Sequence, residues 1–345
     1  MKRWIACALA GLILAAGAAG CAPTGAPAGN TGGENENDGR LSVVATTFAP
    51  FDFARVVVGD KADVSMLLPP AAESHSFEPT PQDTIQVQNC DVFLYVGGDS
   101  DAWVDDVLSS MDVSRMKIIT LMDCVEVVEE EIVEGMEDDE HDHEDGEEDE
   151  DHEDHEDEED HEDHEEEEGP EYDEHVWTSP RNAKLIVQKI SDAFCEEDAA
   201  NADTYRQNTA SYLAELDKLD AAFQEVVAGA RRKTIVLGDR FPFRYFVDAY
   251  GLDYFAAFPG CSTETEPSAA TVAFLIDKIN AEQIPVVFHI ELSNEKMAEA
   301  ISEATGAQVR LLHAAHNISK TDFTNGVGYL DVMWENVDTL KEALG

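Results

Sequence analysis

Histidine is the residue of this chain best suited to do chemistry, and its eleven copies fall into two groups. Neutral imidazole is a good zinc ligand, and a zinc site needs about four nitrogen, sulfur or oxygen ligands in a tetrahedral array. One group lies in a single acidic run and consists of His141, His143, His152, His155, His161 and His164. The other group is scattered and consists of His75, His175, His289, His313 and His316. The scattered group is the candidate for a defined metal site.

Four of the scattered histidines stand next to predicted strand or helix ends. His75 lies in the loop PPAAESHSFEPTP, just beyond a predicted strand, and His175 lies in DEHVWTSP, just before a helix. His289 and His313 stand at the ends of two further strands. One histidine in such a place is more often an ordinary hydrogen-bonded or surface residue. Four of them favour a metal site in a cleft between two α/β lobes, because ligands bind beyond the carboxyl ends of parallel strands.

The elements that position these histidines alternate between strand and helix. Such alternation predicts an α/β fold with mostly parallel sheets. The strands expected are 41–47, 62–68, 91–96 and 117–121, and later 234–237, 286–290 and 308–312. The stretch 252–258 is expected to be a strand or a loop. The helices expected in the second half are 243–250, 268–281, 293–305 and 329–344. Between the two halves we predict a helix from 180 to about 195 and a long one from about 203 to 230, whose apolar residues form one stripe.

The net charge of −52 is concentrated in the acidic run, where 25 of the 32 residues 137–168 are Asp or Glu. The rest of the chain is also acidic, which argues against nucleic-acid binding and suits cationic ligands. The run cannot bury enough apolar surface to fold, so we predict a disordered loop. Its histidines lack a fixed geometry and should bind several zinc ions weakly, although a solvated anionic spacer remains an alternative.

The N-terminus resembles an export signal. Basic residues at 2–3 precede an apolar stretch, and small residues precede Cys21. This arrangement resembles a bacterial lipobox, which implies cleavage before Cys21 and a lipid on its thiol. A plain signal peptide is the alternative. The low-complexity residues that follow would form a flexible tether, and no other apolar run is long enough to span a bilayer. We therefore expect an extracytoplasmic protein anchored to the bacterial cell membrane by lipid.

Four cysteines remain after the lipid site, and they show no CxxC spacing. They allow three disulfide pairings, between which the sequence does not choose, and buried reduced thiols are an equal alternative. These residues are Cys90, Cys124, Cys195 and Cys261.

Several motifs together resemble the substrate-binding lipoproteins of zinc and manganese ABC importers. They are LLPPAAESHSFEPTPQD, VFLYVGGDSDAW, DEHVWTSP, FRYFVDAYGL and EATGA, with the Tyr- and Leu-rich pattern of the long helix. The resemblance implies two Rossmann-like lobes, joined by one long rigid helix, with the metal between them. The domains expected are a signal peptide (1–20), a tether (21–40), an N-terminal lobe (41–180), a helical region (181–230) and a C-terminal lobe (231–345).

The same resemblance implies a ligand set that departs from the family pattern. Its first two histidines fall on His75 and His175, and its last ligand falls on His313. Its third falls on Arg240, which cannot ligate a cation, so Asp239 is one substitute. His289, which replaces a family glutamate, is the preferred fourth ligand. His316 is expected to lie outside the site, at the surface.

The function implied is capture of Zn(II) as cargo for the permease and ATPase subunits of an ABC importer, by a monomeric protein that is not an enzyme. Histidine ligands favour zinc over manganese, which prefers oxygen. HExxH, GxSxG and P-loop motifs are absent from the sequence. A manganese-type binding protein, or a surface adhesin or metal-sequestering lipoprotein without a permease, stays open. A zinc enzyme is less well supported.

Overall fold

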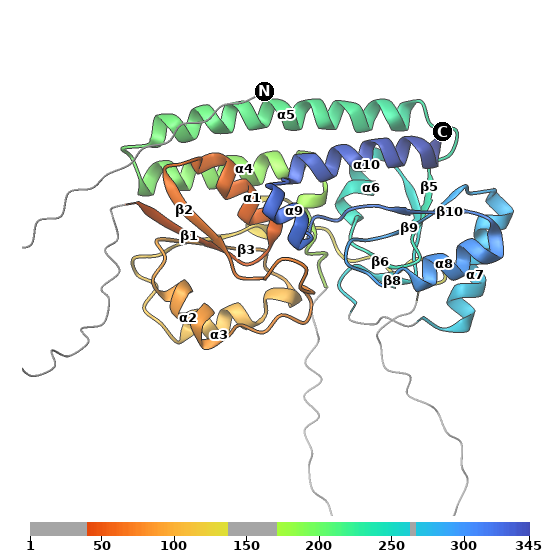
Figure 1. Cartoon of the computed structure of the whole chain (residues 1–345), viewed down its shortest axis with the longest axis horizontal. Coiled ribbons are helices and arrows are strands. Elements are labelled where there is room, and N and C mark those ends of the chain that lie inside the picture. Colours follow the sequence, from red (N-terminus) through yellow and green to blue (C-terminus); the bar gives the residue numbers. More distant parts are fainter. Residues whose placement is uncertain (1–39, 137–170, 263–266) are drawn as a thin grey trace, which may run out of the picture. The chain divides into compact units, whose positions relative to one another are not determined.

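The structure is a computed structural model that describes residues 40–136, 171–262 and 267–345 (Figure 1). The predicted signal peptide, Cys21 and the acidic run with its six histidines lie outside the described residues, and their roles stay predictions. The described residues form one compact unit. The residue bounds expected for the two lobes inside this unit also stay predictions.

The first half is built on a four-stranded sheet in the order β2-β1-β3-β4, with every neighbouring pair parallel. Val43 in the central strand is in register with Val64 on one side and Val92 on the other. The strands are β1 (Leu41–Ala45), β2 (Ala62–Met66), β3 (Val92–Tyr95) and β4 (Lys117–Thr120).

Alternating side chains of this sheet enter two apolar layers, which explains its β-branched and aromatic sequence. Val43 and Leu94 belong to the main core, with residues of α1 (Phe48–Val58). Val44 and Phe93 belong to a smaller cluster that includes Val87 and Val104, on the helices α2 (Pro81–Gln88) and α3 (Trp103–Ser109).

The second half contains three parallel strand pairs, and Leu237 and Phe288 form a parallel bridge between two of them. The pairs are β5 (Thr234–Val236) with β7 (Asp253–Phe255), β6 (Arg240–Phe241) with β8 (Phe258–Pro259), and β9 (Val286–His289) with β10 (Gln308–Leu311). The stretch 252–258, expected to be a strand or a loop, thus contains two short strands with different partners.

The helices of the second half are α6 (Arg244–Tyr250), α7 (Ala269–Glu282), α8 (Lys296–Thr305), α9 (Lys320–Asn325) and α10 (Tyr329–Leu344).

The predicted long helix is α5, Ala202–Ala228, and it contacts helices of both halves (Figure 1). It packs against α1 and α4 (Pro180–Glu197) at one end and against α6 and α10 toward the other. The stripe that predicted it is buried at Tyr205, Tyr212, Leu216, Leu219 and Phe223. At 1.5 Å per residue the helix is about 40 Å long, enough to reach from the first half to the second. The α/β fold with parallel sheets and a long helix is therefore confirmed.

Two further sequence questions are answered for the residues that the structure covers. Cys90, Cys124, Cys195 and Cys261 are free thiols there. Within the described ranges, no helix is both long enough and apolar enough to cross a membrane.

Candidate metal centre

Three histidines from distant parts of the chain converge on one point. His75 comes from the loop between β2 and α2, His175 from the segment before α4, and His316 from the loop after β10. One ligand nitrogen from each lies within 4.8 Å of the other two. The ring centroids of His175 and His316 are 4.5 Å apart, and His75 lies 6.0 Å and 5.4 Å from them. This spacing suits a single metal ion.

His75 has one ring nitrogen engaged and the other available. Its Nδ1 lies 2.9 Å from Oγ of Ser100, whose hydroxyl also donates to the carboxylate of Glu174. Burial, with the neighbouring His175 and Arg240, lowers the pKa of His75 to about 3. The ring is therefore neutral near pH 7, as a metal ligand must be.

His175 is completely buried and is oriented by the carboxylate of Asp173. Oδ1 of Asp173 accepts from the backbone N–H of His175 at 2.8 Å and lies 3.1 Å from its Nδ1. Asp173 is held in turn by the hydroxyl of Tyr245, which donates to its carbonyl at 2.7 Å. Nε2 of His175 has no hydrogen-bond partner among the described residues.

The pKa of His175 moves in the opposite direction from that of His75. Burial lowers the pKa, but the charges of Asp173, Glu174 and Glu130 and the Asp173 hydrogen bond outweigh it, and the pKa is raised. A carboxylate behind a ligating imidazole fixes the ring and increases its basicity. The same carboxylates would stabilise a cation bound at Nε2.

His316 is buried, with 8% of its surface exposed, so the expectation that it lies at the surface is wrong. Its ring packs edge-on against Trp177, with centroids 5.1 Å apart. Within the described structure its Nε2 also has no hydrogen-bond partner. Burial and the nearby charges of His175, His75, Arg240 and His313 lower its pKa well below the usual value.

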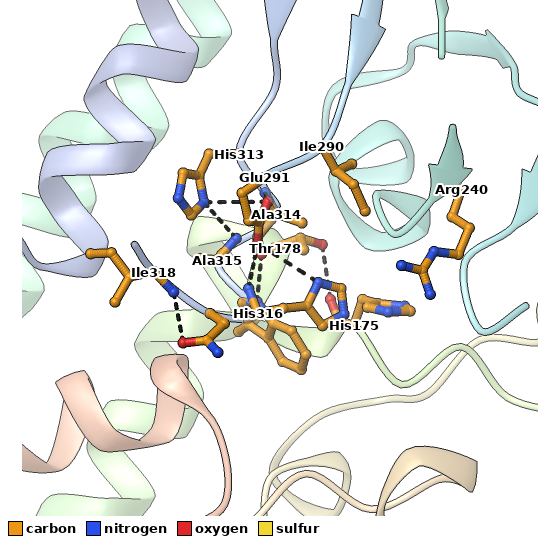
Figure 2. Close-up of polar contacts among 12 residues, drawn as sticks. His175, Thr178, Arg240, Ile290, Glu291, His313, Ala314, Ala315, His316 and Ile318 are labelled. Carbon is orange, nitrogen blue, oxygen red and sulfur yellow. Dashed lines mark hydrogen bonds and ion pairs between the residues drawn. The ribbon is translucent and has the colours of Figure 1, made fainter. Parts of the chain in front are cut away.

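The loop that carries His316 is held by the carboxylate of Glu291 (Figure 2). Oε2 of Glu291 accepts from Ala314 N–H at 2.7 Å, and Oε1 accepts from His316 N–H at 2.9 Å. Ala315, between them, has a φ of 58°, a left-handed conformation uncommon for a residue with a Cβ. This turn brings the His316 ring to the site.

The predicted second-half ligands make other contacts. The backbone N–H of Ala315 donates to Nδ1 of His313 at 2.9 Å, and Figure 2 shows that ring lying away from His175. Nδ1 of His289 bonds to the Ile290 carbonyl at 3.0 Å. The carboxylate of Asp239 accepts from the backbone N–H groups of Arg240 and Ile290. None of these three joins the histidine cluster in the part of the chain described.

Arg240, which the sequence resemblance assigns to the family's third ligand position, points its guanidinium toward His175 (Figure 2). It is 9% exposed, pairs with Glu73 at 3.1 Å, and donates to the Ser262 carbonyl at 3.2 Å. Arg240 and Glu73 line a small pocket together with His75 and His316.

Comparison with known proteins identifies the family of this chain. The model of the family described as "ZnuA: Zinc-uptake complex component A periplasmic" matches residues 43–343. This chain belongs to the ZnuA family. The resemblance predicted from the sequence motifs is therefore confirmed, and the family description is that of a periplasmic component of zinc uptake.

Two ZnuA-family relatives are named for zinc. The high-affinity zinc uptake system protein ZnuA of Bacillus subtilis (strain 168) is 30% identical over 316 residues, covering 91% of each chain. The zinc-binding lipoprotein AdcA of Streptococcus pneumoniae R6 is 28% identical over 310 residues, covering 90% of this chain and 57% of AdcA. The present chain thus spans little more than half the length of AdcA.

A solved relative has the same fold. The Zn(II)-bound ZnuA-like domain of Streptococcus pneumoniae AdcA superposes with a TM-score of 0.68 at 25% identity, covering 88% of this chain and 99% of that domain.

Proposed function

We propose that this protein captures Zn²⁺ outside the cytoplasm through His75, His175 and His316 and delivers it to an ABC-type importer. The observation that carries the proposal is the pair of buried, unpartnered Nε2 atoms of His175 and His316 in the described structure. Leaving a buried polar atom unpaired costs about 1–3 kcal/mol, so two such nitrogens side by side favour a shared ligand. The zinc names of the family and of both relatives support the identity of that ligand.

Zinc is preferred to manganese because the converging ligands are imidazoles, which suit zinc, whereas manganese prefers oxygen. His313, His289 and Asp239 are left out of this proposed set because, among the described residues, none of them joins the histidine cluster.

The proposal also covers the membrane anchor, the acidic run, the partner proteins and the two lobes. A lipid on Cys21 anchors the monomeric protein to the cell membrane, and the permease and ATPase subunits of an importer are its partners. The histidines of the run 137–168 bind further zinc weakly and raise its concentration near the site. Two lobes, 41–180 and 231–345, hold the ion between them and are joined by the helical region 181–230.

Zinc titration in the presence of a chelator that removes weakly held ions tests the proposal. Wild-type protein should retain one tightly bound ion. His75→Ala should lower the zinc affinity of this site by at least ~100-fold, because it removes one of three imidazole ligands. Loss of a residue that only supports a ligand already lowers metal affinity by about 10–100-fold. His289→Ala is the matched control and should retain the site. Wild-type protein without tight zinc would overturn the proposal.

A further inference from the structure

A second group of ligand atoms overlaps the histidine cluster. Glu174, His175 and Cys261 each present one oxygen, nitrogen or sulfur atom within 4.8 Å of the other two. Glu174 and His175 are buried, and Cys261 is partly buried. The group shares only His175 with the three-histidine cluster.

Backbone geometry brings Cys261 to this position. A Cβ at Gly260 would lie 2.8 Å from the Phe241 carbonyl oxygen and 3.0 Å from Cε1 of His175. Real Cβ atoms essentially never approach other atoms so closely, so a glycine here lets the chain pass directly against the imidazole. The backbone N–H of Cys261 then donates to Oε1 of Glu130 at 3.0 Å, which holds the residue in place.

One observation independent of the cysteine points to a ligand here. His175 is 0% exposed, and its Nε2 has no partner in the described residues. Ser100 also links the two groups, because its hydroxyl donates to Glu174 and lies 2.9 Å from Nδ1 of His75. The two groups therefore share His175 and are linked through Ser100.

We propose that Cys261 is a metal ligand, whose thiolate binds the ion held by His175 with Glu174 as the third member of the set. The inference rests on the function proposed above and adds to it a specificity-determining residue. Coordination replaces the S–H bond with a sulfur–metal bond, and the proton leaves to solvent. Oxidation state does not change.

The thiolate supplies what the third family position does not. That position is Arg240, a cation already paired with Glu73. A soft sulfur ligand favours zinc and other thiophilic ions over manganese, magnesium and calcium, which prefer oxygen. Because both groups use His175, the ion has two overlapping ligand sets, and softer ions are drawn toward Cys261.

Cobalt substitution tests this inference on the full chain under reducing conditions. With one equivalent of Co²⁺, wild-type protein should show a thiolate-to-cobalt charge-transfer band in the near ultraviolet. Cys261→Ser should abolish that band but retain the visible bands of bound cobalt. Cys195→Ser is the matched control. Cys195 lies on α4, and its thiol donates to the Ala202 carbonyl at 3.5 Å, so it belongs to neither group of ligand atoms. The acidic run contains no cysteine and contributes nothing to this band.

Competition titrations provide a second readout. Cys261→Ser and Cys261→Ala should weaken Cd²⁺ binding by at least about tenfold, which is the lower end of the effect of losing a supporting metal contact. The same substitutions should weaken Zn²⁺ binding by a smaller factor. Cobalt bound by wild-type protein without a thiolate band would overturn the inference but leave the proposed function intact. Failure of wild-type protein to bind Zn²⁺ or Co²⁺ tightly would overturn both.

Discussion

The two halves of the candidate site differ in how their histidines are positioned. In the first half, His175 is held by Asp173, two residues away, while Nδ1 of His75 lies 2.9 Å from Oγ of Ser100, 25 residues away. In the second half, His316 depends on Glu291, also 25 residues away, through a turn of the backbone. A neighbour in the chain therefore orients His175, whereas the His316 turn is held by a distant side chain. A position set by neighbours in the chain is the kind that a sequence motif predicts best.

The largest expected effect separates His316 from His313. His316→Ala should weaken zinc binding by at least ~100-fold, because it removes an imidazole whose Nε2 is buried and unpartnered in the described structure. His313→Ala should weaken zinc binding by no more than about tenfold, as for a lost supporting contact, because its Nδ1 accepts from the Ala315 N–H of the same turn. Competition titration of both variants measures the difference. The reverse order would restore the ligand predicted from the sequence and remove the contrast between the two halves.

The pH dependence of zinc binding should distinguish His175 from the other two histidines. The pKa of His175 is raised by its carboxylate neighbours, while the pKa values of His75 and His316 are lowered by burial. As the pH falls through the raised pKa, His175 takes up a proton first, whereas the other two rings stay neutral. Affinity should then fall about tenfold per pH unit, the slope of one proton rather than three. Titrations between about pH 5 and 8, bracketing the ordinary histidine pKa of ~6.5, measure this slope. Constant affinity down to pH 5 would contradict histidine ligation.

Glu291 tests whether the second half depends on its distant anchor. Glu291→Ala removes the acceptor for the N–H groups of Ala314 and His316, so the His316 ring should lose its fixed position. Zinc affinity should fall about tenfold, as for a lost supporting contact. The exposed Glu295→Ala, on the N-terminal side of α8, is the matched control. Equal affinities in the two variants would show that the turn needs no anchor.

The smallest effect on the tight site is expected from deletion of 137–168. Tight zinc affinity should change by no more than about twofold, because the histidine cluster is built entirely from described residues outside the run. Total zinc bound at high concentration should fall. Calorimetry separates the two classes of site, and loss of tight binding on deletion would place the principal site in the acidic run.

The strand–helix alternation, the long helix and the family motifs could all be read from the sequence, because periodicity and local turn residues depend on neighbours along the chain. His75 and His175 could be proposed for the same reason. His316 could not, since His313 and His316 lie three residues apart in one loop, and only the turn at Ala315 determines which ring enters the site. That turn is set by Glu291, and the approach of Cys261 by the packing of Gly260 on His175. Contacts between residues far apart in the chain leave no periodic signal, so only the tertiary structure decided them.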